Sequence, residues 1–124
     1  MAAEVSVAET FDSELLQGLR VHALSLPETS EGTSCVNRAF KVRKKNFVFL
    51  GEKPDGTCRL MVKLGPSLEK AAAIEHDGLS VGTTGWVTWN FAGDAPPEAS
   101  LLEGWVVESF RMLAPKTVVR QLDP

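Results

Sequence analysis

Apolar and polar side chains alternate along two short segments of the chain, 39–43 and 58–64. A period of two indicates a β-strand with one buried and one solvated face. The segment between them, 47–50 (FVFL), has no polar side chain, which predicts a central strand covered wholly or partly on both faces. Turn signals at 43–46 and 53–57 join the three segments into a meander.

Helical periodicity flanks these strands. Apolar residues recur at steps of three and four in the N-terminal part, at Leu15, Leu19 and Ala23, and a similar stripe includes Trp105 and Phe110 near the C-terminus. Two further strands, 79–81 and 86–91, are expected before the last helix. Three helices are predicted: one capped by Asp12 or Ser13 and ended by Pro27, one from Gly65 to Gly78, and one that follows Pro97 and ends at Pro115.

This order of elements predicts an α+β fold in which helices pack on one face of an antiparallel sheet. If the apolar residues of the alternating segments face the helices, their cationic neighbours share the opposite, solvated face. These neighbours are Lys41, Arg43, Arg59 and Lys63. The length suits a single domain spanning 1–124, with residues 1–10 as a loosely ordered N-terminal segment.

Positive charge is concentrated in one part of an acidic chain. The formal net charge is −3, from 13 Lys and Arg against 16 Asp and Glu. The segment 32–51 nevertheless contains five cationic residues and no acidic one. Such asymmetry is compatible with one basic face on an acidic body, and it equally describes an ordinary solvated strand pair.

The N-terminal segment lacks a basic region followed by an apolar core, so it does not resemble a signal peptide. No apolar run approaches the ~18 residues of a transmembrane helix. Two cysteines are too few to indicate a disulfide framework. We therefore expect a cytoplasmic protein that does not enter membranes, as a monomer or weak homodimer with free thiols.

No motif for catalysis is found. A phosphate-binding loop, a dinucleotide fingerprint, a nucleophile elbow and a zinc-protease motif are all missing from the sequence. Cys35 would need a base, yet His22 and His76 fall on separate predicted helices. Both Cys35 and Cys58 are better explained as small apolar residues of the core. We expect no catalytic residue, no metal site and no cofactor, and hence a protein that is not an enzyme.

Trp86 and Trp89 are three residues apart, so on a regular strand they point to opposite faces of the sheet. One should belong to the core, and the other should be exposed or packed at an edge. An exposed aromatic beside basic residues can stack on a nucleobase. The alternative is that both tryptophans pack against helix ends or loops.

Four segments, in this order and spacing, resemble the MmcQ/YjbR family: Leu26–Ser34, Arg38–Phe47, Gly85–Trp89 and Phe110–Lys116. The resemblance extends from about residue 23 to residue 119. It implies a fold similar to bacterial frataxin (CyaY-like) and a function as a DNA-binding protein.

The first hypothesis is therefore a non-enzymatic DNA-binding module that neutralises phosphates with a basic hairpin and sheet face. A second is a small-molecule or protein-binding scaffold with a pocket formed by the open sheet face, Trp86 and the Arg38 loop. A third, a frataxin-like metal or cluster-assembly role, follows only from analogy of fold. The candidate nucleic-acid-binding residues are Arg38, Lys41, Arg43, Lys44, Lys45, Arg59, Lys63 and Trp86.

Overall fold

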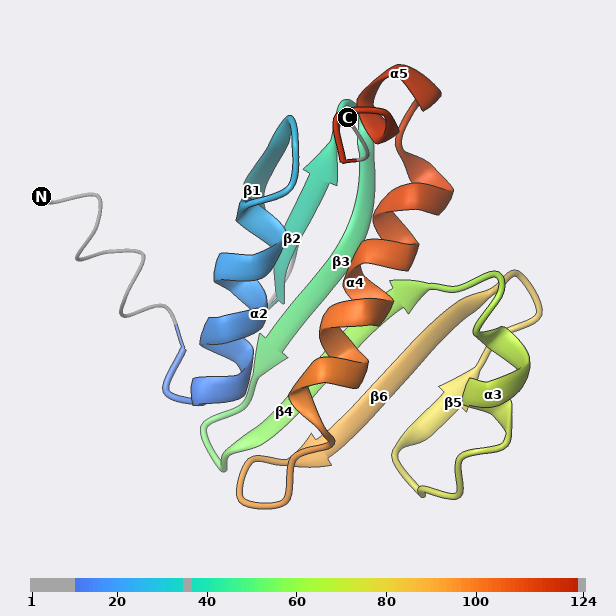
Figure 1. Cartoon of the computed structure of the whole chain (residues 1–124). Helices are drawn as coiled ribbons and strands as arrows, with labels where there is room; N and C mark the ends of the chain where they lie inside the picture. Colours follow the sequence, from blue (N-terminus) through green and yellow to red (C-terminus); the bar gives the residue numbers. More distant parts are fainter. Residues whose placement is uncertain (1–10, 35–36, 123–124) are drawn as a thin grey trace, which may run out of the picture.

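The computed structural model describes residues 11–34 and 37–122. These residues build a six-stranded antiparallel sheet with the order β1-β2-β3-β4-β6-β5 (Figure 1). The first four strands form a meander, which contains the predicted three-strand unit. The strands are β1 (Thr29–Ser34), β2 (Asn37–Val42), β3 (Lys45–Glu52), β4 (Thr57–Lys63), β5 (Leu79–Val81) and β6 (Trp86–Ala92).

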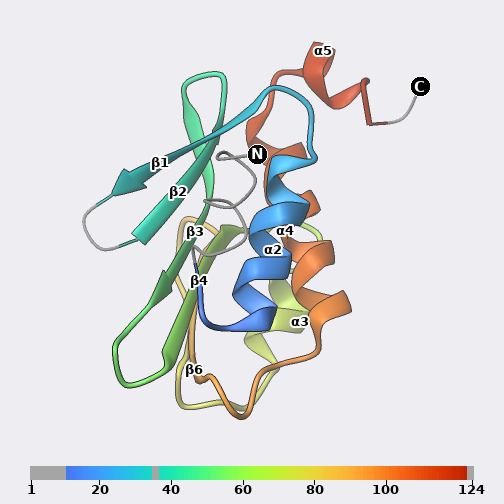
Figure 2. The same cartoon turned by 90° about the vertical axis from the view of Figure 1, so that its left-hand side faces the viewer.

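Helices cover one face of this sheet. The helices are α2 (Glu14–Leu24), α3 (Leu68–Ala72), α4 (Ala99–Leu113) and α5 (Lys116–Val119). Figure 2 shows two layers, with α2, α3 and α4 on the same side of the sheet. The predicted α+β class and antiparallel sheet are confirmed, whereas the predicted N-terminal segment 1–10 lies outside the described residues. Within the described part of the chain, no helix combines the length and apolar character needed to cross a bilayer.

The core lies between the two layers and is built from alternate strand residues. Phe40, Val48, Val62 and Val87 are opposite one another in successive strands, and each is at most 1% exposed. The apolar stripes of α2 and α4 pack on this surface. The next row of the same face consists of Leu50, Leu60 and Trp89.

A β-bulge interrupts the register of β3. Phe40 pairs with Val48, but the next pair joins Lys41 to Asn46, so Phe47 is the extra residue. A bulge lets two successive side chains lie on one face. Phe47 and Val48 are accordingly both fully buried. The bulge therefore explains how two successive apolar residues of the segment 47–50 are both buried in the core.

Ser109 of α4 completes the hydrogen bonding at this bulge. Its Oγ donates to the carbonyl oxygen of Phe47 and accepts from the N–H of Lys63 at 2.9 Å. Ser109 is fully buried, and the ring of Phe110 beside it contacts Phe47 edge to face, with centroids 5.3 Å apart. Helix α4 thus provides hydrogen-bond partners for one backbone group of β3 and one of β4. Both groups lie one residue beyond the last β3–β4 pair, Val48 and Val62.

Three elements differ from the sequence-based predictions, and one of them is α5, which follows Pro115, where no further helix was predicted. Strand β1 was not predicted because its sequence, TSEGTS, has no apolar residue that would mark a buried face. The predicted helix over 65–78 is shorter, since α3 has only five residues. After it the chain crosses to the edge of the sheet, where the carbonyl oxygen of Gly78 accepts from the N–H of Asn90 at 2.8 Å. Pairing with the sheet edge thus takes the place of the last turns of the helix that helix propensity predicts over 65–78.

Candidate nucleic-acid interface

Three of the predicted cations share the face of the sheet opposite the helices, which we call the open face. Lys41 follows the buried Phe40 on β2. Arg59 and Lys63 alternate on β4 with the buried residues that face α4. The shared face predicted from the period of two is confirmed for these three residues. Arg43 is the exception, because β2 ends at Val42.

The open face also carries aromatic side chains. Trp86 starts β6 and is directly opposite Lys63 on β4. Its ring lies 5.9 Å from that of Phe49 on β3, at an interplanar angle of 55°. Trp89, by contrast, is only 4% exposed and packs 5.5 Å from Trp105. The prediction that the two tryptophans of β6 point to opposite faces is confirmed.

The described strands place no carboxylate on the open face. Their two acidic residues, Glu31 on β1 and Glu52 on β3, both lie on the helix side. Glu52 accepts hydrogen bonds from the N–H groups of Asp12 and Ser13 at the start of α2, both at 2.9 Å. Among the described residues, the cations without an ion pair include Lys41, Lys44, Lys45, Arg59 and Lys63.

Arg38 lies on the helix side, away from this surface. It is opposite the buried Leu50, and its Nε donates to Glu31 at 2.7 Å. The same carboxylate accepts from the guanidinium of Arg20, a 4%-exposed residue of α2. Burial raises the pKa of Glu31, but the bonds from Arg20 and Arg38 outweigh it, and the net pKa is lowered. Arg38 therefore links β2 to β1 through its ion pair with Glu31, and the shared carboxylate links both strands to α2.

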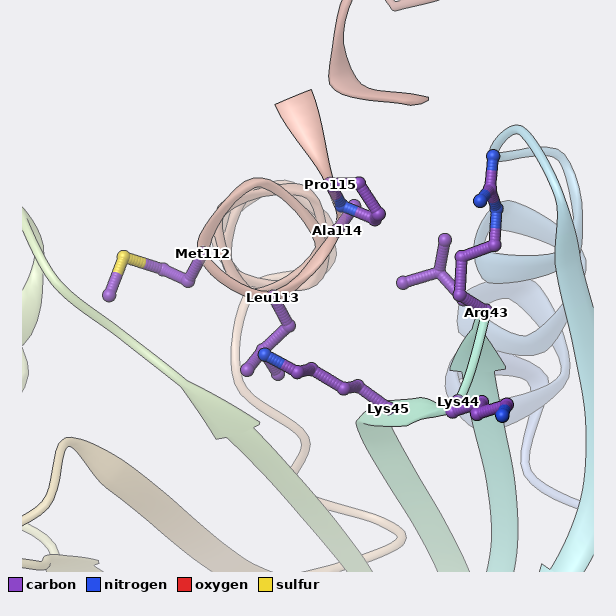
Figure 3. Close-up of a pocket in the computed structure, with 8 residues that line it drawn as sticks. Arg43, Lys44, Lys45, Met112, Leu113, Ala114 and Pro115 are labelled. Atoms are coloured by element: carbon purple, nitrogen blue, oxygen red, sulfur yellow. The ribbon is translucent and has the colours of Figure 1, made fainter. Parts of the chain in front are cut away.

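The hairpin between β2 and β3 holds its three cations in different surroundings (Figure 3). Arg43 has a φ of 59°, and its guanidinium donates to Glu28 at 2.5 Å. This hydrogen bond raises the pKa of Arg43 and lowers the pKa of Glu28. Lys44 points away from α4, whereas Lys45 extends toward Leu113 of that helix. All three cations are exposed, and Lys44 differs from the other two in that it neither pairs with Glu28 nor extends toward α4.

A comparison with protein-family models gives one result. The model described as YjbR matches residues 24–112. The chain belongs to the YjbR family. In this YjbR protein the match begins at the last residue of α2 and includes the whole sheet and nearly all of α4. No curated protein matches the chain.

A pocket of about 750 Å³ lies beside the hairpin of this YjbR protein (Figure 3). Val42 and Lys45 line it from the hairpin, and Leu113 and Pro115 line it from the end of α4. The predicted small-molecule pocket was different, because it combined Trp86 with the Arg38 loop. The side chain of Arg38 lies on the opposite face of the sheet from Trp86, and residues 35–36 of that loop lie outside the described residues.

The structure of the YjbR protein adds residues that the sequence reasoning missed. Phe49 was taken as part of an apolar run, and only the register with β4 and β6 places it beside Trp86. Gly51 lies beside Asn37 on this face, and a Cβ at Gly51 would displace the side-chain amide of Asn37. Cys58 is fully buried and free, in agreement with its assignment to the core, whereas Cys35 lies outside the described residues.

Proposed function

We propose that this YjbR protein is a non-enzymatic DNA-binding protein whose open sheet face and hairpin tip contact the phosphate backbone. The observation that carries the proposal is the gathering of Lys41, Arg59 and Lys63 on a face to which the described strands contribute no carboxylate. Cations that lack an acidic neighbour can exchange their counterions for phosphates, and the released counterions drive binding. Family membership is consistent with this function but does not test it.

Three of the cations predicted from the sequence are left out of the proposed phosphate contacts. Arg38 and Arg43 neutralise Glu31 and Glu28, and binding phosphate with them would require these ion pairs to open. Lys45 extends toward Leu113 on the helix side. The remaining contacts are Lys41, Lys44, Arg59 and Lys63.

The test is the salt dependence of binding to a fluorescently labelled DNA duplex, measured by anisotropy. Four phosphate contacts predict a slope of about −3.6 in a plot of log K against log salt concentration. The double variant Arg59→Glu/Lys63→Glu should bind more weakly at every salt concentration, with a shallower slope. A control of equal charge change, Lys53→Glu/Lys70→Glu, reverses two exposed lysines outside the proposed contact set.

A slope near zero for the unaltered protein would refute phosphate binding. Equal effects of the two double variants would show that net charge, and not the open face, governs the affinity.

A second function, binding of a small molecule, is favoured by the pocket beside the hairpin. Its volume of about 750 Å³ is within the usual range for ligand sites, and its walls combine apolar side chains with the ammonium group of Lys45. These features suit an anion with an apolar body. Stabilisation of the protein by such a molecule, together with no binding to DNA, would favour this function over the first.

A further inference from the structure

Phe49 and Trp86 form an aromatic pair on the open face, where the two-layer fold provides no covering helix in the described residues. Phe49 on β3 is opposite Met61 on β4, which is opposite Thr88 on β6. Trp86 lies two residues before Thr88, so its ring reaches Phe49 diagonally across β4. All four side chains are partly exposed. An apolar surface is thus centred on the middle strands of a solvated face.

Cations surround this aromatic pair. Lys63 is directly opposite Trp86, and Arg59 is two residues from Met61 along β4, on the same face. Lys41 adds a third charge from β2. An aromatic surface for base stacking within a positively charged surface is the combination by which proteins bind single-stranded nucleic acids. A purely apolar protein partner would leave these three charges without compensation at the interface.

We propose that Phe49 and Trp86 stack on the bases of single-stranded nucleic acid while Lys41, Arg59 and Lys63 hold its phosphates. This inference rests on the proposed function and specifies the form of nucleic acid that the open face prefers. In a duplex the faces of the bases are occupied by neighbouring bases, so the aromatic rings gain nothing from it. A single strand can present its bases to the rings and its phosphates to the cations at the same time.

The experiment compares a labelled oligo-dT strand with a mixed-sequence duplex of equal length, by anisotropy at one fixed salt concentration. We expect Phe49→Leu/Trp86→Leu, which keeps apolar side chains but removes both aromatic rings, to weaken binding of the single strand about tenfold or more. Its affinity for the duplex should stay within about twofold of the unaltered protein. The control Val21→Ala/Leu101→Ala alters exposed apolar residues of α2 and α4 and should change neither affinity.

The single variant Trp86→Phe keeps an aromatic ring and should retain most of the single-strand affinity. If the double variant does not fold, the comparison of Trp86→Phe with Trp86→Leu replaces it. These two single variants differ in the aromatic ring, so a difference in their single-strand affinities reports stacking. An oligo-rU strand in parallel shows whether the preference extends to RNA. Its binding should depend on the same two rings, since stacking uses only the faces of the bases.

The outcomes separate this inference from the proposed function. Equal weakening of single-strand and duplex binding, or no weakening of either, overturns the stacking role and leaves phosphate binding in place. Equal single-strand affinities of Trp86→Phe and Trp86→Leu also overturn it. No binding of the unaltered protein to either form overturns both.

Discussion

Replacing Ser109 by Ala removes the hydroxyl that connects α4 to the bulged strand β3 and to the neighbouring strand β4. The side chain is fully buried and serves two backbone groups, the carbonyl of Phe47 and the N–H of Lys63. Alanine leaves both groups without that partner, and each buried group left unsatisfied costs about 1–3 kcal/mol. We therefore expect the free energy of unfolding to fall by about 2–6 kcal/mol, a large part of the ~5–15 kcal/mol of a typical domain.

Urea unfolding followed by tryptophan fluorescence measures this loss, because Trp89 and Trp105 are buried in the core. With a denaturant slope of about 2 kcal/mol per molar urea, the midpoint should fall by about 1–3 M. The matched control is Ser100→Ala on the same helix, where the hydroxyl is exposed and donates only to Glu98 at 2.7 Å. Its effect should stay within about 0.5 kcal/mol.

Equal unfolding free energies for Ser109→Ala and Ser100→Ala would refute the reasoning. Such a result would mean that the strands, or water, satisfy Phe47 and Lys63 without the helix.

Two further predictions concern carboxylates. Burial raises the pKa of Glu108, but hydrogen bonds from Ser67 and Gly65 outweigh it and lower the pKa overall. The stability that Glu108 contributes should therefore be fully present above the ordinary glutamate pKa of about 4.3 and lost as the pH falls through the lower folded value. The difference in unfolding free energy between the unaltered protein and Glu108→Gln should close in that acidic range, and a difference independent of pH would contradict it. Glu31→Gln, which removes the charge between Arg20 and Arg38, should cost about 3 kcal/mol in urea unfolding. Glu28→Gln, at the exposed pair with Arg43, should cost much less, and equal losses would contradict the role of burial.

Part of the candidate site follows from the sequence because strand geometry is local. Side chains alternate between the faces of a strand, so apolar residues at 40, 60 and 62 place Lys41, Arg59 and Lys63 on the other face. The same pattern predicts the separation of Trp86 from Trp89, and neither conclusion requires knowledge of which strands are neighbours. The antiparallel meander follows from the turn signals that join consecutive segments.

Tertiary structure decides which cations form ion pairs with carboxylates and which aromatic side chains lie near the remaining cations. Arg38 and Arg43 look like Lys41 in the sequence, but only folding brings Glu31 and Glu28 to them. Likewise, Phe49 meets Trp86 because β4 lies between their strands, and no local pattern encodes that order. The period of two depends on the backbone of one strand, whereas ion pairs and ring contacts depend on pairing between distant segments. The sequence by itself therefore determines the faces of the residues in the alternating segments. The fold determines the neighbours of these residues, and also the bulge that places Phe47 and Val48 on one face.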